Sequence, residues 1–281
     1  MQLKIQFLLI LALSSSIISS AQGKLKGNKI VNTQSRDITE FTSMKINGNI
    51  DVYIFQGNSS FVTVETDENL QIAVQATVVG ETLKIELSEK ISKSTKLKMF
   101  VTVTDKLNKI TAYDNANIYA DTRIILKSLT INAFDNAGFD MKIDADDFKI
   151  NGFKNTDLKF HVFSKDLKTI ISESCELKLE GEIDSLSAEI KNHGVITAKG
   201  IGKTLEINAF NNGTFRGDYF KVEKAIINAN SRTKITVNVT ESIKIAAEKK
   251  AAVSIYNEPA IEIEKLEGKA KIYKKKSTKL F

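Results

Sequence analysis

The sequence repeats itself with a period of about twenty residues. The stretch "LTINAFDNAGFD" at 129–140 returns as "LEINAFNNGTFR" at 205–216, 76 residues later. Self-similarity at a fixed short period is typical of repeat architectures, in which one copy is too small to bury its own apolar face and neighbouring copies stack to form a core. Equivalent residues of successive copies are therefore expected to lie against one another.

Eight copies align when the second residue of the asparagine-containing turn is used as a marker. The markers are Asn115, Asn136, Asn155, Ser174, Asn192, Asn212, Arg232 and Lys250, with spacings of 21, 19, 19, 18, 20, 20 and 18 residues. Five residues before the marker, six of the eight copies have isoleucine; three residues after it, all eight copies have an apolar residue. The register is blurred in the fourth and fifth copies, where Ile171 and Glu189 stand at a position that elsewhere favours small residues.

The period and the local pattern together favour strands. Side chains alternate around the marker, as at Ile131 and Ala133 before it, and asparagine at the marker tolerates left-handed backbone geometry. Almost no helical periodicity is present, and Pro259 is the one proline. The expected fold is all-β: a parallel β-solenoid (β-helix) of about eight coils of 18–21 residues. A β-sandwich is the main competitor, whereas the leucine-rich-repeat consensus does not recur.

The chain divides into four expected segments. Residues 1–21 have the basic start, apolar stretch and small residues before Gln22 of a secretory signal peptide. Short alternating strands separated by turn residues predict an N-terminal β-rich head over 28–105, followed by solenoid repeats over 106–260 and by terminal strands and a basic tail over 261–281. The leader predicts an exported protein, periplasmic, surface-located or secreted. No segment approaches the ~20 apolar residues of a membrane span, so no transmembrane segment is expected.

The charge balance is basic, with a formal net charge of +6 that falls to +5 when the leader removes Lys4. The excess gathers at the end, where "KAKIYKKKSTKLF" contains Lys269, Lys271, Lys274, Lys275, Lys276 and Lys279. Such a run is usually a solvated tail, and its functional interpretation is electrostatic contact with an anionic surface. Nucleic acid is not expected as a partner, because no binding motif accompanies the charge and the leader directs the chain outside.

The residues that carry most enzyme and metal chemistry are few. Cys175 is the single cysteine, which excludes an intrachain disulfide, and with only His161 and His193 the usual ligands of a structural zinc site are missing. A Cys–His nucleophilic pair is the functional alternative for Cys175, but a packed core thiol is favoured. His193 is expected in a turn rather than as a general base. No cofactor is expected.

Two sets of residues form a candidate binding surface. Two residues before the marker, four copies have an aromatic side chain: Tyr113, Phe134, Phe153 and Phe210. Core packing is the favoured interpretation of this column, although strict strand alternation would turn it outward as an exposed stripe. One residue before the marker, Asp114 is expected to lie over Asp135, close enough to raise a pKa or hold a cation; the alternative is a neutralised charge ladder.

Residues 41–87 resemble the start of the head-GIN-domain family of putative autotransporter adhesins, which is common in Bacteroidetes. The matching residues are Gly48, Asn49, Ile50, Asp51, Val52, Gln56, Gly57, Val64, Glu65, Asp67, Glu68, Asn69, Leu70, Gly80, Leu83, Lys84 and Ile85. The resemblance covers about 40–255. It implies a right-handed β-solenoid similar to pectin-lyase folds, without an established catalytic site, and a role in adhesion at the cell surface.

The function expected from these observations is non-enzymatic binding of a glycan or protein partner at the cell surface or in the periplasm. The alternative is a carbohydrate-active enzyme, lyase-like or hydrolase-like, with Asp114 and Asp135 as its acidic pair, because such enzymes also use β-helices. A structural envelope protein without a soluble ligand is the third hypothesis.

Overall fold

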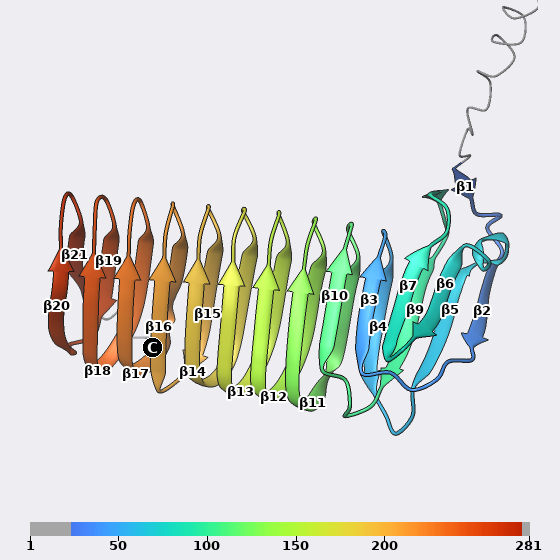
Figure 1. The fold of residues 1–281 in the computed structure, drawn as a ribbon, viewed down its shortest axis with the longest axis horizontal. Coiled ribbons are helices and arrows are strands. Elements are labelled where there is room, and N and C mark those ends of the chain that lie inside the picture. Colours follow the sequence, from blue (N-terminus) through green and yellow to red (C-terminus); the bar gives the residue numbers. More distant parts are fainter. Residues whose placement is uncertain (1–23, 277–281) are drawn as a thin grey trace, which may run out of the picture.

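The computed structural model describes residues 24–276. The expected leader lies outside the described residues, as does Lys279. Figure 1 shows a long row of strands wound into a solenoid, with an irregular group of strands at its N-terminal end. The solenoid has about nine turns, so the expected β-solenoid of about eight coils is confirmed.

The strands fall into two groups. Those outside the regular coils, together with one short 3-10 helix, are β1 (Leu25–Lys26), β2 (Val31–Arg36), β5 (Phe61–Asp67), η1 (Glu68–Leu70), β6 (Val74–Val79), β7 (Thr82–Leu87), β8 (Ile91–Lys93) and β9 (Leu97–Val103). Those of the coils are β3 (Ser43–Asn47), β4 (Asp51–Gln56), β10 (Lys109–Tyr113), β11 (Asn117–Ala133), β12 (Gly138–Gly152), β13 (Asp157–Ile171), β14 (Glu176–Ile190), β15 (Val195–Ile201), β16 (Thr204–Ala209), β17 (Thr214–Ala229), β18 (Lys234–Ala247), β19 (Ala252–Tyr256), β20 (Ala260–Leu266) and β21 (Lys271–Lys275).

Each coil runs along one face, reverses at a tight turn and returns along the other face. We name these the pre-turn face and the post-turn face. The long strands β11 to β14, β17 and β18 begin on the post-turn face and bend into the pre-turn face of the next coil. Successive strands pair in parallel, as in Ile110↔Ile131↔Ile150 before the turn and Phe139↔Leu158↔Leu177 after it. The opening repeat is thus four coils apart in the stack.

The tight turns adopt the left-handed geometry that the asparagines predict. Two consecutive residues have positive φ in most turns, for example Asp135 (54°) and Asn136 (68°). This is the requirement of a type I′ turn, and asparagine and aspartate tolerate it best. The turns also bond to one another: the Asn115 amide donates to the Asp135 carbonyl at 3.2 Å, and the Asn136 amide donates to the Lys154 carbonyl at 3.1 Å. The turn row is therefore part of the coil-to-coil ladder.

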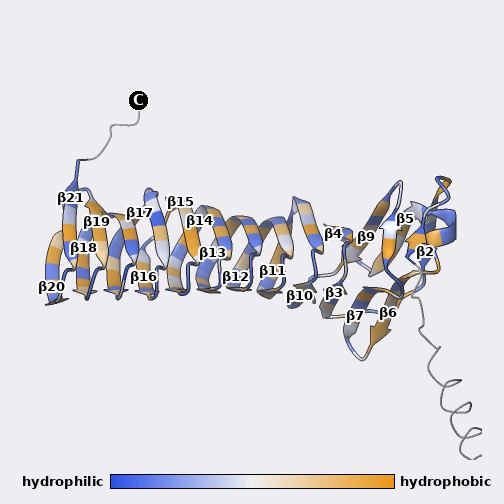
Figure 2. Cartoon of the chain, turned by 90° about the horizontal axis from the view of Figure 1, so that it is seen from above, coloured by the Kyte–Doolittle hydropathy of each residue, from blue (hydrophilic) through white to orange (hydrophobic). Residues whose placement is uncertain are grey.

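The core consists of files of apolar side chains running the length of the stack. Figure 2 shows hydrophobic and hydrophilic residues alternating along the strands. The file five residues before the turn marker contains Ile131, Ile150, Ile207 and Ile245, all fully buried. A file of this kind buries each member against its copies above and below, which no single coil achieves.

The expected register was wrong by one residue in the fifth copy. The strand pairing aligns Ala188 and Ile196 with the two core files, in place of Ser187 and Val195. The marker of that copy is therefore His193 (φ 69°) rather than Asn192 (φ 48°), because both residues are left-handed and the second holds the marker position. A slip of one residue reverses every side chain of a strand. This slip accounts for the irregular fifth copy, whereas Thr169 and Ile171 of the fourth copy do occupy the core columns.

The N-terminal strands extend and cover the stack. β7 pairs in parallel with β3, and β9 pairs in parallel with β4, so both faces continue past the first coil. Antiparallel strands then follow: β6 lies on β7, and β5 lies between β9 and β2. The core is closed at this end, where Leu70 and Val74 are buried. β3 and β4, from the segment expected as the head, form a coil that pairs directly with β10 and β11.

The motif residues of the head carry structural contacts. Asp67 is fully buried and accepts hydrogen bonds from the Lys29 amide (2.6 Å), the Thr95 amide (2.6 Å) and the Thr95 hydroxyl (2.9 Å). Asn69 accepts from the Asn28 amide at 2.8 Å and donates to the Lys26 carbonyl at 2.9 Å. These two side chains fasten the first described segment to the body of the head.

Candidate binding surface

The aromatic column lies on the outer surface of the pre-turn face, so the favoured core interpretation was wrong. Tyr113, Phe134 and Phe153 are half-buried and stacked on one another, with ring centroids 5.1 and 5.5 Å apart and ring planes inclined by only 11° and 12°. Strand alternation turns this column away from the core, because its neighbours Ala112, Ala133 and Gly152 point inward. Phe210 is 38% exposed and is separated from the stack by Ser172 and Lys191 in the same column.

The three stacked rings are not a platform for a flat ligand. Their faces lie against one another along the stack, so mainly ring edges meet the solvent. The Nζ atom of Lys45 lies 5.5 Å from the centroid of Tyr113 and occupies the outer face of that ring. Stacked cross-strand aromatic pairs contribute to sheet stability in their own right. The stack is thus a stabilising ladder that leaves little ring surface free for a ligand.

Asp114 and Asp135 lie in adjacent turns, as expected, but their carboxylates have different surroundings. Asp135 forms an ion pair with Lys154, the Oδ1 and Nζ atoms lying 3.0 Å apart, and the hydrogen bond to this carboxylate raises the pKa of Lys154. Asp114 lines a cleft on the N-terminal side instead. Within residues 24–276, no group of three His, Cys, Asp or Glu side chains converges in the manner of a metal site. At Asp135 the acidic charge is therefore neutralised by the lysine of the next turn, which agrees with the alternative of a neutralised charge ladder.

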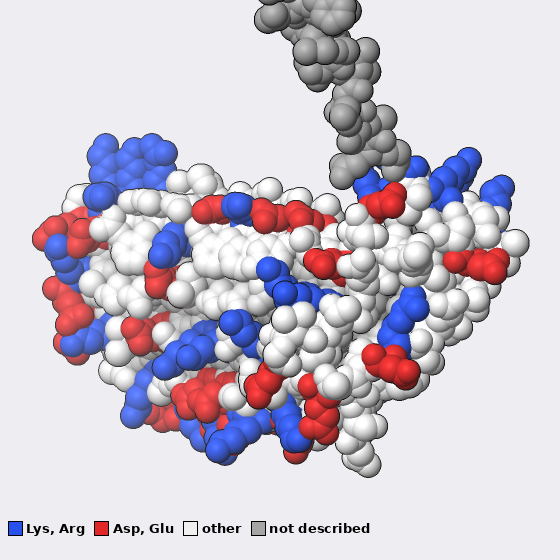
Figure 3. Space-filling view, turned by 45° about the vertical axis from the view of Figure 1, so that its right-hand side comes forward, with Lys and Arg blue, Asp and Glu red and all other residues white. Residues whose placement is uncertain are grey.

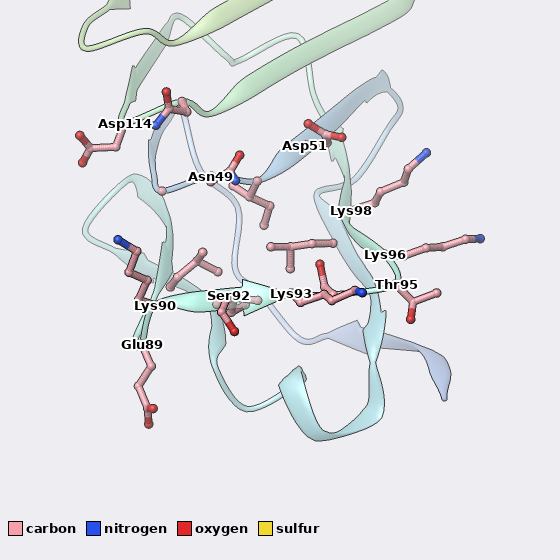
Figure 4. A pocket seen from close by; sticks show the side chains of 17 residues that line it. Asn49, Asp51, Glu89, Lys90, Ser92, Lys93, Thr95, Lys96, Lys98 and Asp114 are labelled. Atoms are coloured by element: carbon pink, nitrogen blue, oxygen red, sulfur yellow. The ribbon is translucent and has the colours of Figure 1, made fainter. Parts of the chain in front are cut away.

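The cleft beside Asp114 separates the first coil from the loop around β8 (Figure 4) and has a volume of about 840 Å³. Asn49 and Asp51 lie on its coil side, and Ser92 and Lys93 lie across from them. Lys96 and Lys98 extend away from its centre in Figure 4. Lys96 pairs with Glu65 at 2.7 Å, and the Nζ atom of Lys98 lies 4.9 Å from the centroid of the Tyr53 ring. Two of the cations at the rim are therefore engaged outside the cleft.

A second depression, the basic groove, crosses four coils of the post-turn face and has a volume of about 720 Å³. The charged and polar side chains that line it are Arg123, Asp140, Lys142, Lys159, His161, Lys178, Glu180, Thr197 and Lys199. They come from adjacent strands β12 to β15, with Arg123 added from β11. Most of them form two outward columns of the sheet, through the successive strand pairings Asp140↔Lys159↔Lys178↔Thr197 and Lys142↔His161↔Glu180↔Lys199.

One wall of the basic groove is a fixed arginine. The pairing of β11 with β12 is irregular between Ala120 and Ile124, and Arg123 projects from this irregularity. Its guanidinium lies 4.1 Å from the centroid of the Phe163 ring and 3.6 Å from Asp144. A guanidinium held over an aromatic face has lost much of its rotational freedom before any ligand arrives.

The cations of the basic groove outnumber the carboxylates that they pair with. Lys159 lies 2.9 Å from Asp140, and Lys178 lies 3.3 Å from Asp157. Among the described residues, Lys142 and Lys199 have no carboxylate within 4.0 Å. Figure 3 shows acidic and basic side chains intermingled over much of one side of the molecule. Two lysines without a carboxylate partner thus lie in the basic groove, at opposite ends of the column from Lys142 to Lys199.

The basic groove was not among the features predicted from the sequence. Its cations occupy two different columns, four and six residues after the marker, and neither column is uniformly basic. The expected register aligned Lys178 with Lys159, but Lys199 follows the misplaced fifth marker, so it was not brought into the column of Lys142. Aligning outward positions by the corrected turns would have revealed the cluster.

The expected packed position of Cys175 and turn position of His193 are confirmed. Cys175 is fully buried, and burial raises the pKa of its thiol to about 12. A thiol of this kind is almost wholly protonated at neutral pH, which makes it a poor nucleophile. His193 lies in its turn with Nε2 3.3 Å from the Asn212 side-chain nitrogen.

In the described part of the chain, no helix is long and apolar enough to cross a membrane.

Comparison with known proteins identifies the family. The model of the family described as "Putative auto-transporter adhesin, head GIN domain" matches the chain twice, over residues 40–161 and 150–259. The chain belongs to this family. The two matched ranges overlap at residues 150–161, within the stack of coils. This agrees with a repeat that continues through the solenoid. No curated protein matches the chain.

Several solved structures share the fold of this family member. A putative adhesin from Parabacteroides distasonis is 20% identical with a TM-score of 0.65, covering 90% of this chain and 100% of that one. A putative adhesin from Parabacteroides merdae is 20% identical with a TM-score of 0.62, covering 89% and 98%. A protein from P. distasonis described as a putative lipid binding protein is 18% identical with a TM-score of 0.62, covering 90% and 99%. At these identities the likeness shows the fold.

Proposed function

We propose that this family member is an exported, non-enzymatic adhesin that binds an acidic glycan along the basic groove of its post-turn face. The proposal rests on one observation above the others: Lys142 and Lys199 lie in the groove without a carboxylate partner, on either side of His161 and Glu180. Membership of a family of putative adhesins supports the class of function.

The repeat geometry suits a polymer that carries regularly spaced anions. Neighbouring strands are ~4.8 Å apart, so the four coils present their cations over roughly 14 Å. The side chains stand on a continuous parallel sheet, which fixes the backbone beneath them. A preorganised array reduces the ordering cost of binding, and lysine and arginine are the usual partners of carboxylates and sulfates. A chain of uronate or sulfated sugars would meet several cations at once.

The enzyme hypothesis is less well supported. Its acidic pair would need Asp114 and Asp135 to act together, but Asp135 is engaged by Lys154 at 3.0 Å and Asp114 lines the cleft on the other side. The similar solved structures are described as putative adhesins and a putative lipid binding protein. Incubation with the same acidic glycans, followed by analysis of chain length, distinguishes the two: shortened polymer would favour the enzyme.

Charge reversal in the basic groove tests the proposal. In Lys142→Glu/Lys199→Glu, affinity for heparin and for polygalacturonate, measured by biolayer interferometry, is expected to fall by at least about tenfold, because two free cations become anions facing the ligand. Binding by the unaltered protein is expected to weaken steeply with added salt.

A matched control carries the same change of charge on the opposite face. Lys109 and Lys168 are exposed on the pre-turn face. Lys109→Glu/Lys168→Glu is expected to keep most of the affinity. Equal loss in both double variants would show that net charge alone attracts the glycan, and no binding by the unaltered protein would refute the proposal.

A further inference from the structure

The C-terminal end of the solenoid leaves its core files open. Ile261 and Ile263 of β20 continue the files of Ile243 and Ile245, which are 2% and 0% exposed, yet they are 45% and 51% exposed themselves. Leu266 is 48% exposed for the same reason. Large apolar side chains grouped at one end of a solenoid are the feature that a capping element normally covers.

The two strands at this end also present free edges. Within residues 24–276, β20 pairs only with β18, and β21 pairs only with β19. Each strand therefore has a row of backbone amides and carbonyls with no strand beyond it. Exposed edges of this kind are the usual templates for strand addition.

The charges of the two edges are opposite. Glu262 and Glu264 lie on β20, with Glu258 and Glu267 just outside it. The one lysine of β20, Lys265, is already paired with Glu248 at 2.6 Å and with Glu267 at 3.4 Å. β21 and the residue after it contain Lys271, Lys274, Lys275 and Lys276. Figure 3 shows a group of basic side chains standing out at the C-terminal end of the molecule. Pairing β20 with another β20, or β21 with another β21, would place like charges together.

The geometry points to a second copy of this chain as the occupant. We propose that two copies join end to end about a two-fold axis parallel to the strands. This rotation keeps the strand direction but exchanges the two faces, so that β20 of each copy comes beside β21 of the other. The chain reverses between β20 and β21 at the turn containing Gly268, so the new neighbours run antiparallel. The acidic edge then meets the basic edge twice.

The assembly closes after two copies. The head covers the N-terminal end of the stack, so within residues 24–276 exposed core files occur only at the C-terminal end, and an isologous contact buries them. The coil cross-section suggests a buried area of ~1,000 Å² in total, at the low end of specific interfaces. The dimer is therefore expected to dissociate in the micromolar range and to weaken with salt.

Paired charge-swap variants test the dimer by analytical ultracentrifugation. The unaltered protein is expected to shift from monomer to dimer between about 1 and 100 µM. Glu262→Lys/Glu264→Lys alone and Lys271→Glu/Lys275→Glu alone are each expected to weaken self-association at least tenfold, because each places like charges across both edges. An equimolar mixture of the two variants is expected to restore the dimer.

The mixture is also the folding control, since misfolded variants would not rescue one another. Lys244 pairs with Glu264 at 2.7 Å and with Glu262 at 3.6 Å in its own chain, so thermal melting by circular dichroism verifies each variant. A monomer at all concentrations, or a dimer that neither variant weakens, would overturn the proposal. Failure of the mixture to associate would overturn the exchanged pairing of β20 with β21.

Discussion

Gly200→Ala is expected to destabilise the protein by ~4 kcal/mol or more, or to prevent folding. A Cβ atom at residue 200 would lie 1.9 Å from the carbonyl oxygen of Gly181 in the preceding coil, and Gly200 has φ +119°, a conformation that residues with side chains rarely adopt. Gly181 has the same relation to the Val162 carbonyl, at 2.0 Å with φ +144°. In both cases the obstacle is the backbone of the preceding coil, so relief requires neighbouring coils to move apart. Guanidinium unfolding followed by far-ultraviolet circular dichroism measures the change.

Gly80→Ala is the matched control for this experiment. Gly80 also has positive φ, at +63°, but no atom lies within 4 Å of the position of its Cβ. Only the conformational cost applies there, about 1–2 kcal/mol. Equal destabilisation by the two substitutions would contradict the close approach of successive coils at Gly200.

Asp67→Ala is expected to destabilise the protein by about 2–3 kcal/mol at neutral pH. Its carboxylate receives three hydrogen bonds from Lys29 and Thr95, two segments that it holds together. Burial by itself raises the pKa of the Asp67 carboxyl, but the hydrogen bonds from Thr95 and Lys29 outweigh it and lower the pKa below its ordinary value. Hydrogen exchange should show that the backbone amides of residues 25–30 and those around Thr95 lose protection first.

The effect of Asp67 depends on pH in a defined direction. Because the folded-state pKa is lowered, its stabilising contribution is present above the unfolded pKa of ~3.9 and is lost as the pH falls through the folded value. The difference in stability between the unaltered protein and Asp67→Ala should thus be constant near neutrality and shrink under acid conditions. Asp121→Ala, at an exposed position, is the control and should change stability little. A difference that grows on acidification would contradict the lowered pKa.

The fold was predictable because equivalent residues of successive repeats are in contact in the stack. Isoleucine at Ile131, Ile150 and Ile207 reports the same core position in separate coils, so the stack follows from the spacing alone. The prediction failed by one residue at His193, because asparagine and histidine both occupy left-handed positions there and the more familiar turn residue was chosen.

The candidate site was less predictable for physical reasons. Aromatic side chains at Phe134 and Phe153 are compatible with core or surface, and only the direction of their strand decides between them. The basic groove needs cations from four coils, an irregular strand that releases Arg123, and knowledge of which lysines lack a partner. The motif residues Asp67 and Asn69 were recognisable from the sequence, but their structural role depends on contacts with segments about forty and thirty residues away.

Distances between spin labels test the stacking of coils most directly. Lys109, Glu206 and Lys244 occupy one outward column, five and seven coils apart through the pairings 109↔130↔149↔168↔187↔206↔226↔244. With ~4.8 Å per coil, pulsed electron paramagnetic resonance on Cys pairs replacing Lys109 and Glu206, or Lys109 and Lys244, should give backbone separations of about 24 and about 34 Å. Distances that increase by this step confirm the stack, and distances that do not increase with coil number would contradict it.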